Sequence, residues 1–181
     1  MRTFPHPLRR ILRGELRFHW MHTAGRIEEV RNELTELAQT VPSSQELMQA
    51  MVKILHERML PYNWVGFYLL EPGAQPPMLV LGAFEGAMTP HTRIPLNQGI
   101  CGAAASSGLT VVVDDVNKDP RYLACSLETK SEIVVPVFVR GKVVGELDID
   151  SHCAAAFTSE HQDLLHHCAR LVGKKFETDG Q

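Results

Sequence analysis

The chain lacks any run of apolar residues long enough to cross a membrane, since a spanning helix needs about 20 consecutive apolar residues. It is also poor in cysteine, with four among 181 residues, well below the density of small secreted folds that disulfides hold together. Internal repeats and low-complexity tracts are absent too. These absences argue against a membrane protein and a disulfide scaffold, and they favour a cytoplasmic protein with free thiols.

The chain carries no excess of positive charge, with a formal net charge of -3 and a pI near 6.3. Domains that bind nucleic acid usually carry a basic patch, so we expect no nucleic-acid partner. Arginines gather only in the first twenty residues, where Pro5 and Pro7 leave no apolar centre for a secretory signal. We predict an N-terminal extension over residues 1–22 without a functional role, followed by one globular domain over residues 23–177.

Hydrophobic spacing predicts helices at both ends of this domain and strands between them. The helical stretches, where apolar residues recur every three or four positions, are 24–38, 44–60 and the segment from 158 onward. Branched and aromatic residues favour strands over 62–70, 78–84, 110–113, 133–139 and 142–150. Small residues near 103–105 favour a short helix, and the polar stretch 114–130 favours a long loop. This order of elements predicts an α+β domain.

Two cysteines, Cys101 and Cys125, lie in polar or glycine-containing segments rather than in apolar runs. Cys101 belongs to residues 98–102, whose glycines let the backbone approach a ligand closely, so its surroundings favour reactivity over packing. Cys168 lies on the apolar stripe of the last helix and is expected in the core, and Cys153 is interpreted as an incidental thiol. No four candidate ligands show the spacing of a zinc site, so we expect no metal and no cofactor.

Three acids, Glu146, Asp148 and Asp150, alternate along residues 142–150 and therefore share one face of the predicted strand. In an antiparallel sheet such alternation usually marks an outer face in contact with water. On this pattern alone we favour that interpretation over a buried acid site.

The neighbouring strand contributes a fourth acid, Glu132, among apolar residues on its own face. A strict two-residue turn at residues 140–141 would point Glu132 away from Asp148 and Asp150. A three-residue loop with a bulge places all of them on a common face. We predict this second arrangement.

Several motifs follow one another in the order of a known family. They are NWVGFYLL, LVLGAFEG, RIPLNQGICG, SEIVVPV and VVGELDIDS, together with the step at residues 124–126. With these motifs the chain resembles a GAF domain, and within that family the free methionine-(R)-sulfoxide reductases, over roughly residues 27–176. The resemblance implies a six-stranded antiparallel sheet, with helices on one side and a small pocket for free methionine sulfoxide on the other.

The resemblance also implies a role for the thiols and the acids. Cys125 would attack the sulfoxide sulfur, while Glu132, Asp148 and Asp150 would hold the ammonium group and protonate the departing oxygen. These residue types suit the reaction, because a sulfoxide oxygen leaves poorly until it is protonated, and clustered carboxylates raise one another's affinity for protons. The first products would be methionine and a sulfenic acid on Cys125.

Two further groups are candidates for binding the substrate. Trp64 and Tyr68 match family positions that wall the methyl end of the ligand, although ordinary core aromatics would show the same pattern. The backbone amides of Gly99, Ile100 and Gly102, at a predicted helix N-terminus, suit a carboxylate.

The chain departs from the family pattern at one position. A sulfenic acid condenses with a second thiol, and a dithiol such as thioredoxin reduces the resulting disulfide. The family usually carries a recycling cysteine where this chain has His91, to which we assign no catalytic role. Cys101 matches a third family cysteine, and a helix N-terminus would favour its thiolate, so we predict Cys101 as the resolving thiol.

Two other functions stay open at this point. A GAF domain can act as a non-catalytic sensor of a small ligand, because fold alone does not decide function. Cys101 and Cys125 can also form a reversible disulfide in a redox sensor. The sequence leaves the order of attack by the two thiols undecided, and it leaves open a homodimer through the amphipathic first helix.

Overall fold

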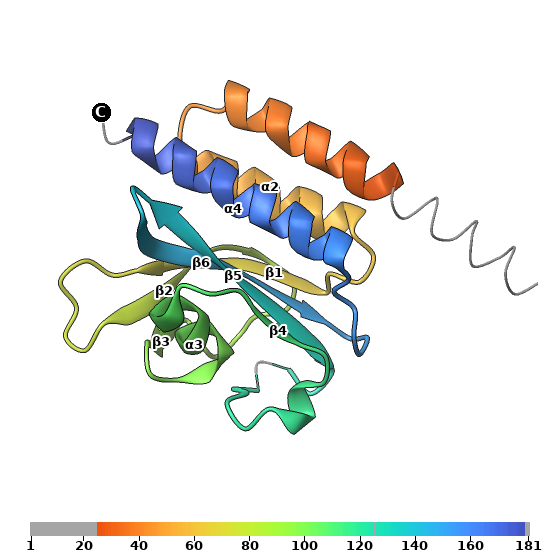
Figure 1. Ribbon diagram of the computed structural model, residues 1–181, viewed down its shortest axis with the longest axis vertical. Coiled ribbons are helices and arrows are strands. Elements are labelled where there is room, and N and C mark those ends of the chain that lie inside the picture. The colour runs from red at the N-terminus through yellow and green to blue at the C-terminus, as the bar shows by residue number, and fades with distance from the viewer. Residues whose placement is uncertain (1–24, 125, 180–181) are drawn as a thin grey trace, which may run out of the picture.

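The computed structural model describes residues 25–124 and 126–179 and confirms the α+β class (Figure 1). A helix over residues 25–40 comes first, and the remaining helices are α2 (Ser44–Arg58), α3 (Gly99–Ser107), the 3-10 turn η1 (Val116–Lys118) and α4 (Ser159–Asp179). The strands are β1 (Trp64–Leu70), β2 (Met78–Glu85), β3 (Arg93–Pro95), β4 (Val111–Val113), β5 (Ser131–Val139) and β6 (Lys142–Ser151). Within these two ranges no helix is both long and apolar enough to cross a membrane. The extension predicted over residues 1–22 lies outside the described residues.

The six strands form one antiparallel sheet in the order β3-β2-β1-β6-β5-β4. The predicted pairs β1–β2 and β5–β6 are confirmed as neighbours, and β6 joins the two pairs at the centre of the sheet. Strand β3 was not predicted, because its three residues are too few to show a pattern of alternation.

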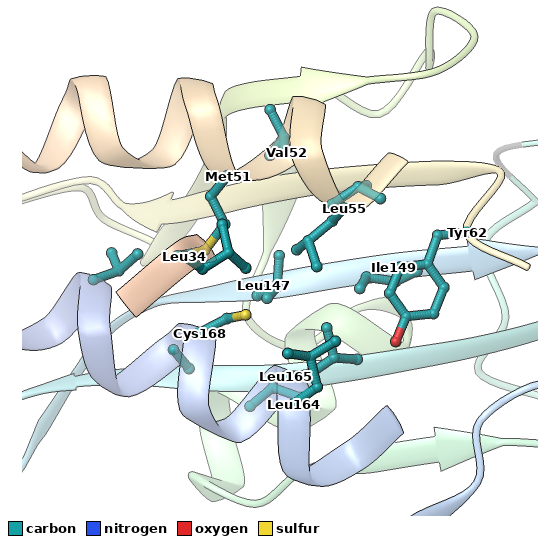
Figure 2. Close-up of a cluster of buried hydrophobic side chains, with 14 of the residues drawn as sticks. Leu34, Met51, Val52, Leu55, Tyr62, Leu147, Ile149, Leu164, Leu165 and Cys168 are labelled. Carbon is teal, nitrogen blue, oxygen red and sulfur yellow. The ribbon is translucent and has the colours of Figure 1, made fainter. Parts of the chain in front are cut away.

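Helices cover the two faces of the sheet unequally. The helix over residues 25–40, α2 and α4 pack on one face, whereas α3 lies alone against the other (Figure 1). Figure 2 shows the core beneath the larger helical layer, where Leu34, Met51 and Leu165 surround Leu147 and Ile149 of β6. Full burial of such a side chain contributes roughly 1.5–3 kcal/mol. Because Leu147 and Ile149 belong to this core, the even-numbered residues of β6 from Glu146 to Asp150 point toward α3.

The start of α2 shows how local sequence sets an element boundary. Ser43 is the N-cap, and its Oγ accepts a hydrogen bond of 3.2 Å from the backbone N–H of Glu46. This satisfies one of the N–H groups that a helix leaves unpaired in its first turn. Ser43 thereby fixes the start of α2 at Ser44, which confirms the start predicted for this helix.

The first helix directs its apolar stripe into the core of its own chain. Ile27, Val30 and Leu34 are all buried there against α2, α4 and the sheet. A second copy of the chain therefore does not have this stripe available for packing.

Candidate active site

Four carboxylic acids are buried on the face of the sheet that α3 covers. Glu146, Asp148 and Asp150 of β6 are 0%, 3% and 4% exposed, and Glu132 of β5 is 5% exposed. The interpretation of the β6 acids as a face in contact with water is therefore wrong. Its physical reason is α3, which packs against β5 and β6 and which the alternation within β6 could not reveal. Burying this many acids is costly unless they bind something or hold protons.

The register of the β5–β6 hairpin brings Glu132 to the other acids. Glu132 pairs directly with Asp150, and Val134 pairs with Asp148. The predicted common face is confirmed, but the predicted three-residue loop is wrong. The turn has two residues, Arg140 and Gly141, both with positive φ as type I′ geometry requires. An extra residue on β6, between Val143 and Gly145, restores the common face further along the strand.

Trp64 and Tyr68 of β1 form an aromatic wall beside the acids. On the neighbouring β6, Trp64 pairs with Asp150 and Tyr68 with Glu146, so both aromatics share the acids' face. Their ring centroids are 6.2 Å apart. Trp64 Nε1 donates to the Ala87 carbonyl at 3.0 Å, and the Tyr68 hydroxyl donates to the His91 carbonyl at 2.7 Å. Both rings are thus fixed at their polar ends.

Gly66, between the two aromatics, leaves room for the indole. It pairs with Asp148 on β6, and a Cβ at this position would lie 2.2 Å from Cη2 of Trp64. The indole therefore lies directly over the backbone of Gly66. Only a residue without a side chain permits this approach next to the acids.

Cys101 lies in the first turn of α3 and points into the acid cluster. Its Sγ donates to Oδ2 of Asp148 at 3.4 Å, and its side chain is buried beside Trp64 and Ile100. The expectation that its setting favours reactivity over packing is wrong. The expected effect of the helix N-terminus on the thiolate is wrong as well, because burial, followed by the charges of Asp148, Glu146 and Glu132, raises the pKa of Cys101 well above its usual value. Cys101 is therefore a protonated, hydrogen-bonding thiol.

The acids differ in their affinity for protons. Burial, followed by the charge of Asp148, raises the pKa values of Glu132, Glu146 and Asp150 well above their usual range. Burial also raises the pKa of Asp148, to about 7, while the hydrogen bond from the Cys101 thiol opposes the increase. The cluster thus combines three acids whose raised pKa favours the protonated form with Asp148, which titrates near neutral pH. Such a difference separates proton donors from charge-bearing groups.

One of the three backbone amides predicted to bind a carboxylate, that of Gly102, is engaged within α3. Its N-cap residue, Gln98, makes no side-chain hydrogen bond to the first turn, which leaves the amides of Gly99 and Ile100 without a capping side chain. The amide of Gly102 donates to the Gln98 carbonyl at 3.0 Å and is engaged within the helix. Gly102 matters for packing instead, since a Cβ there would lie 2.8 Å from the Leu96 carbonyl oxygen.

The predicted nucleophile, Cys125, lies outside the described residues, so its position near the acids stays a prediction. Residues on both sides of it are held by hydrogen bonds. His91 Nε2 lies 3.3 Å from the Ala124 carbonyl oxygen, and the Tyr122 hydroxyl donates to the Ser126 carbonyl at 3.2 Å. His91, to which we assign no catalytic role, is half-buried and contacts the segment that precedes Cys125.

Glu146 belongs to the acid cluster, although the sequence did not mark it as a site residue. Burial, followed by the charge of Asp148, raises the pKa of its carboxyl, while the Cys101 thiol lowers it. Neither of its carboxylate oxygens has a hydrogen-bond partner within the described residues. The alternation along β6 placed Glu146 on the same face as the other acids, and that was the only sequence signal for it.

Comparison with known proteins agrees with this geometry. The model of the GAF domain family matches residues 43–175. The free methionine-R-sulfoxide reductase of Escherichia coli (strain K12) is 37% identical over 125 residues, which cover 69% of this chain and 73% of that protein.

Two solved structures extend the similarity to three dimensions. The X-ray structure of the free methionine-R-sulfoxide reductase from Neisseria meningitidis, in complex with its substrate, aligns with a TM-score of 0.81 at 34% identity, covering 88% of this chain and 94% of that one. A type II free methionine-R-sulfoxide reductase from Thermoplasma acidophilum aligns with a TM-score of 0.69 at 41% identity, covering 80% and 96% of the two chains.

Proposed function

This chain belongs to the GAF domain family and, within it, to the free methionine-R-sulfoxide reductases, and from that membership we propose that it reduces free L-methionine-(R)-sulfoxide to L-methionine. The observation that carries the proposal is the convergence of Glu132, Asp148, Asp150 and Cys101 on one buried face beside Trp64. These residues provide carboxyl groups, a thiol and an aromatic side chain around one place where the substrate can bind.

The substrate contacts follow from the charges of the cluster. Asp148, whose pKa of about 7 lets it carry charge near neutral pH, is the carboxylate that pairs with the substrate ammonium group. Trp64 and Tyr68 offer an apolar wall to the methyl end of the substrate. The amides of Gly99 and Ile100 are placed to receive the carboxylate, as helix N-termini commonly do.

In the first half of the reaction, the Cys125 thiolate attacks the sulfoxide sulfur. Glu132 or Asp150, which burial keeps protonated, donates a proton to the oxygen. Two electrons pass from the cysteine to the substrate, and the oxygen is transferred to the cysteine. Methionine leaves, and Cys125 remains as a sulfenic acid.

In the second half, the Cys101 sulfur attacks the sulfenic acid, water leaves and a disulfide forms. Asp148 accepts the Cys101 proton, because its Oδ2 already accepts the thiol hydrogen bond at 3.4 Å, and a proton returns from the acid cluster to the departing hydroxyl, which leaves as water. Thioredoxin then reduces the disulfide. Cys101 thereby replaces the recycling cysteine whose position His91 occupies.

The test is steady-state turnover coupled to thioredoxin, thioredoxin reductase and NADPH. We expect consumption of the R epimer of the free amino acid, little consumption of the S epimer, and no turnover by Cys125→Ser. Cys153→Ser is the matched control, because Cys153 is an exposed free cysteine that has no part in the proposed mechanism. Turnover that survives Cys125→Ser would refute the mechanism. Substrate binding without conversion would identify a sensor domain instead.

The location, domain organisation and oligomeric state of the protein are proposed as well. We propose a cytoplasmic location, where thioredoxin keeps Cys101 and Cys125 reduced, and an N-terminal extension over residues 1–22 ahead of a catalytic domain over residues 23–177. A homodimer is proposed as well, through surfaces other than the buried stripe of the first helix. Light scattering on the protein as it elutes from a size-exclusion column measures its oligomeric state directly.

A further inference from the structure

The acid cluster also contains the donor atoms of a metal site. One ligand atom each from Cys101, Glu132 and Asp148 lies within 4.8 Å of the other two, and all three residues are buried. A tetrahedral zinc ion with bonds of about 2.0–2.3 Å keeps its ligands roughly 3.5 Å apart. These donor atoms therefore lie close to the spacing that such an ion requires, and a fourth ligand would complete its coordination.

A second observation points to a cation at this place. Both carboxylate oxygens of Glu146 and Oδ1 of Asp148 are buried and have no hydrogen-bond partner within the described residues. A buried carboxylate without partners is costly, so it either holds a proton or is paired with a cation or a metal. Arg121, whose charge interacts with Glu132, already forms an ion pair with Asp119 at 2.6 Å.

The type of donor atom selects the metal. Carboxylates alone would suit magnesium or calcium, whereas a thiolate together with carboxylates suits zinc and cadmium. Cys101 contributes the sulfur, so the cluster is not an ordinary acidic patch.

We propose that Cys101, Glu132 and Asp148 bind one zinc ion, with Glu146 beside them, and that this ion competes with the ammonium group of the amino acid. The zinc site stands on the geometry of these residues. Its effect as an inhibitor rests on the proposed function, because the same Asp148 serves both ligands.

The test uses the reduced, full-length protein and two metal probes. Zinc affinity is measured by competition with a chromophoric chelator, and cadmium is followed through the absorption of the cadmium–thiolate bond. We expect one tight equivalent of zinc and a cadmium–thiolate band, both retained by Cys153→Ser. Cys101→Ser should lose the band and weaken zinc binding by more than about 100-fold, since even partners that only support metal ligands contribute about 10–100-fold.

Further measurements distinguish binding at the proposed zinc site from binding at other thiols, and loss of binding from misfolding. Asp148→Asn keeps the shape of its side chain and should also weaken zinc binding, while circular dichroism verifies that each variant is folded. Free L-methionine should lower the apparent affinity for zinc. The zinc site is overturned if the wild type binds no zinc, if Cys101→Ser retains the ion or if Cys153→Ser loses it, and the competition is overturned if methionine has no effect on zinc binding. Because binding is measured without turnover, an inactive protein that binds zinc would refute the proposed function alone.

Discussion

The substitution Asp148→Asn tests two properties of the acid cluster separately. One is the free energy that a buried charge costs on folding, and the other is the binding of the substrate. Asparagine has nearly the same shape, and its side-chain oxygen still accepts the hydrogen bond that Cys101 donates at 3.4 Å. The substitution removes the charge that burial disfavours and that raises the pKa values of Glu132, Glu146 and Asp150. We therefore expect a variant that is more stable than the wild type at alkaline pH and unable to hold the substrate ammonium group.

The size of the effect follows from the pKa of Asp148. Folding raises this pKa from 3.8 to about 7, and each pKa unit corresponds to about 1.4 kcal/mol, which gives roughly 4 kcal/mol. The sign follows from proton binding. Below pH 3.8 the Asp148 carboxyl is protonated in both the folded and the unfolded state, and its ionisation costs no stability. Between pH 3.8 and about 7 only the folded state keeps the proton, so the free energy of unfolding falls as pH rises.

The assay is urea unfolding followed by circular dichroism at several pH values between about 4 and 8, with a chelator present. Asp148→Asn should gain stability relative to the wild type as pH rises, approaching about 4 kcal/mol at pH 8. Asp163→Asn, which changes an exposed carboxylate on α4, is the control and should follow the wild type. A constant difference between Asp148→Asn and the wild type across this range would refute the reasoning.

Three further predictions test other parts of the site and fold. Gly66→Ala should displace the Trp64 indole, because the new Cβ would lie 2.2 Å from Cη2. We expect a loss of about 1–3 kcal/mol in stability and a lower kcat/KM for the sulfoxide; an unchanged kcat/KM would contradict the proposed aromatic wall. Glu132→Gln should lower kcat by about 10²–10⁴-fold if this acid protonates the oxygen, whereas Asp163→Asn in the same assay should not. Ser43→Ala removes the cap of α2 and should cost about 1 kcal/mol in urea unfolding without changing kcat.

Much of the fold could be predicted because each pattern was local. The apolar stripe of α4, the Ser43 cap and the alternation along β6 are properties of neighbouring residues, and the structure confirms each of these elements. Strand β3 escaped prediction because only its pairing with β2 defines it.

The acid site could be predicted only in part, because burial is a property of the whole fold. The register of Glu132 and Asp150 depends on an extra residue in β6, several positions away from where the sequence suggested it. The burial of Glu146 and the neutral state of Cys101 both follow from the position of α3 over the sheet. Nothing in the vicinity of Cys101 along the chain indicates that position.

The most direct test of the account is a single turnover without reductant, in which methionine is counted per protein molecule. The reduced wild type and Cys101→Ser should each release about one equivalent from the R epimer of the free amino acid, and Cys125→Ser should release none. Only the wild type should then lose two thiols, since only it can form the disulfide. One equivalent of methionine from Cys125→Ser, or none from Cys101→Ser, would contradict the claim that Cys125 attacks and Cys101 resolves.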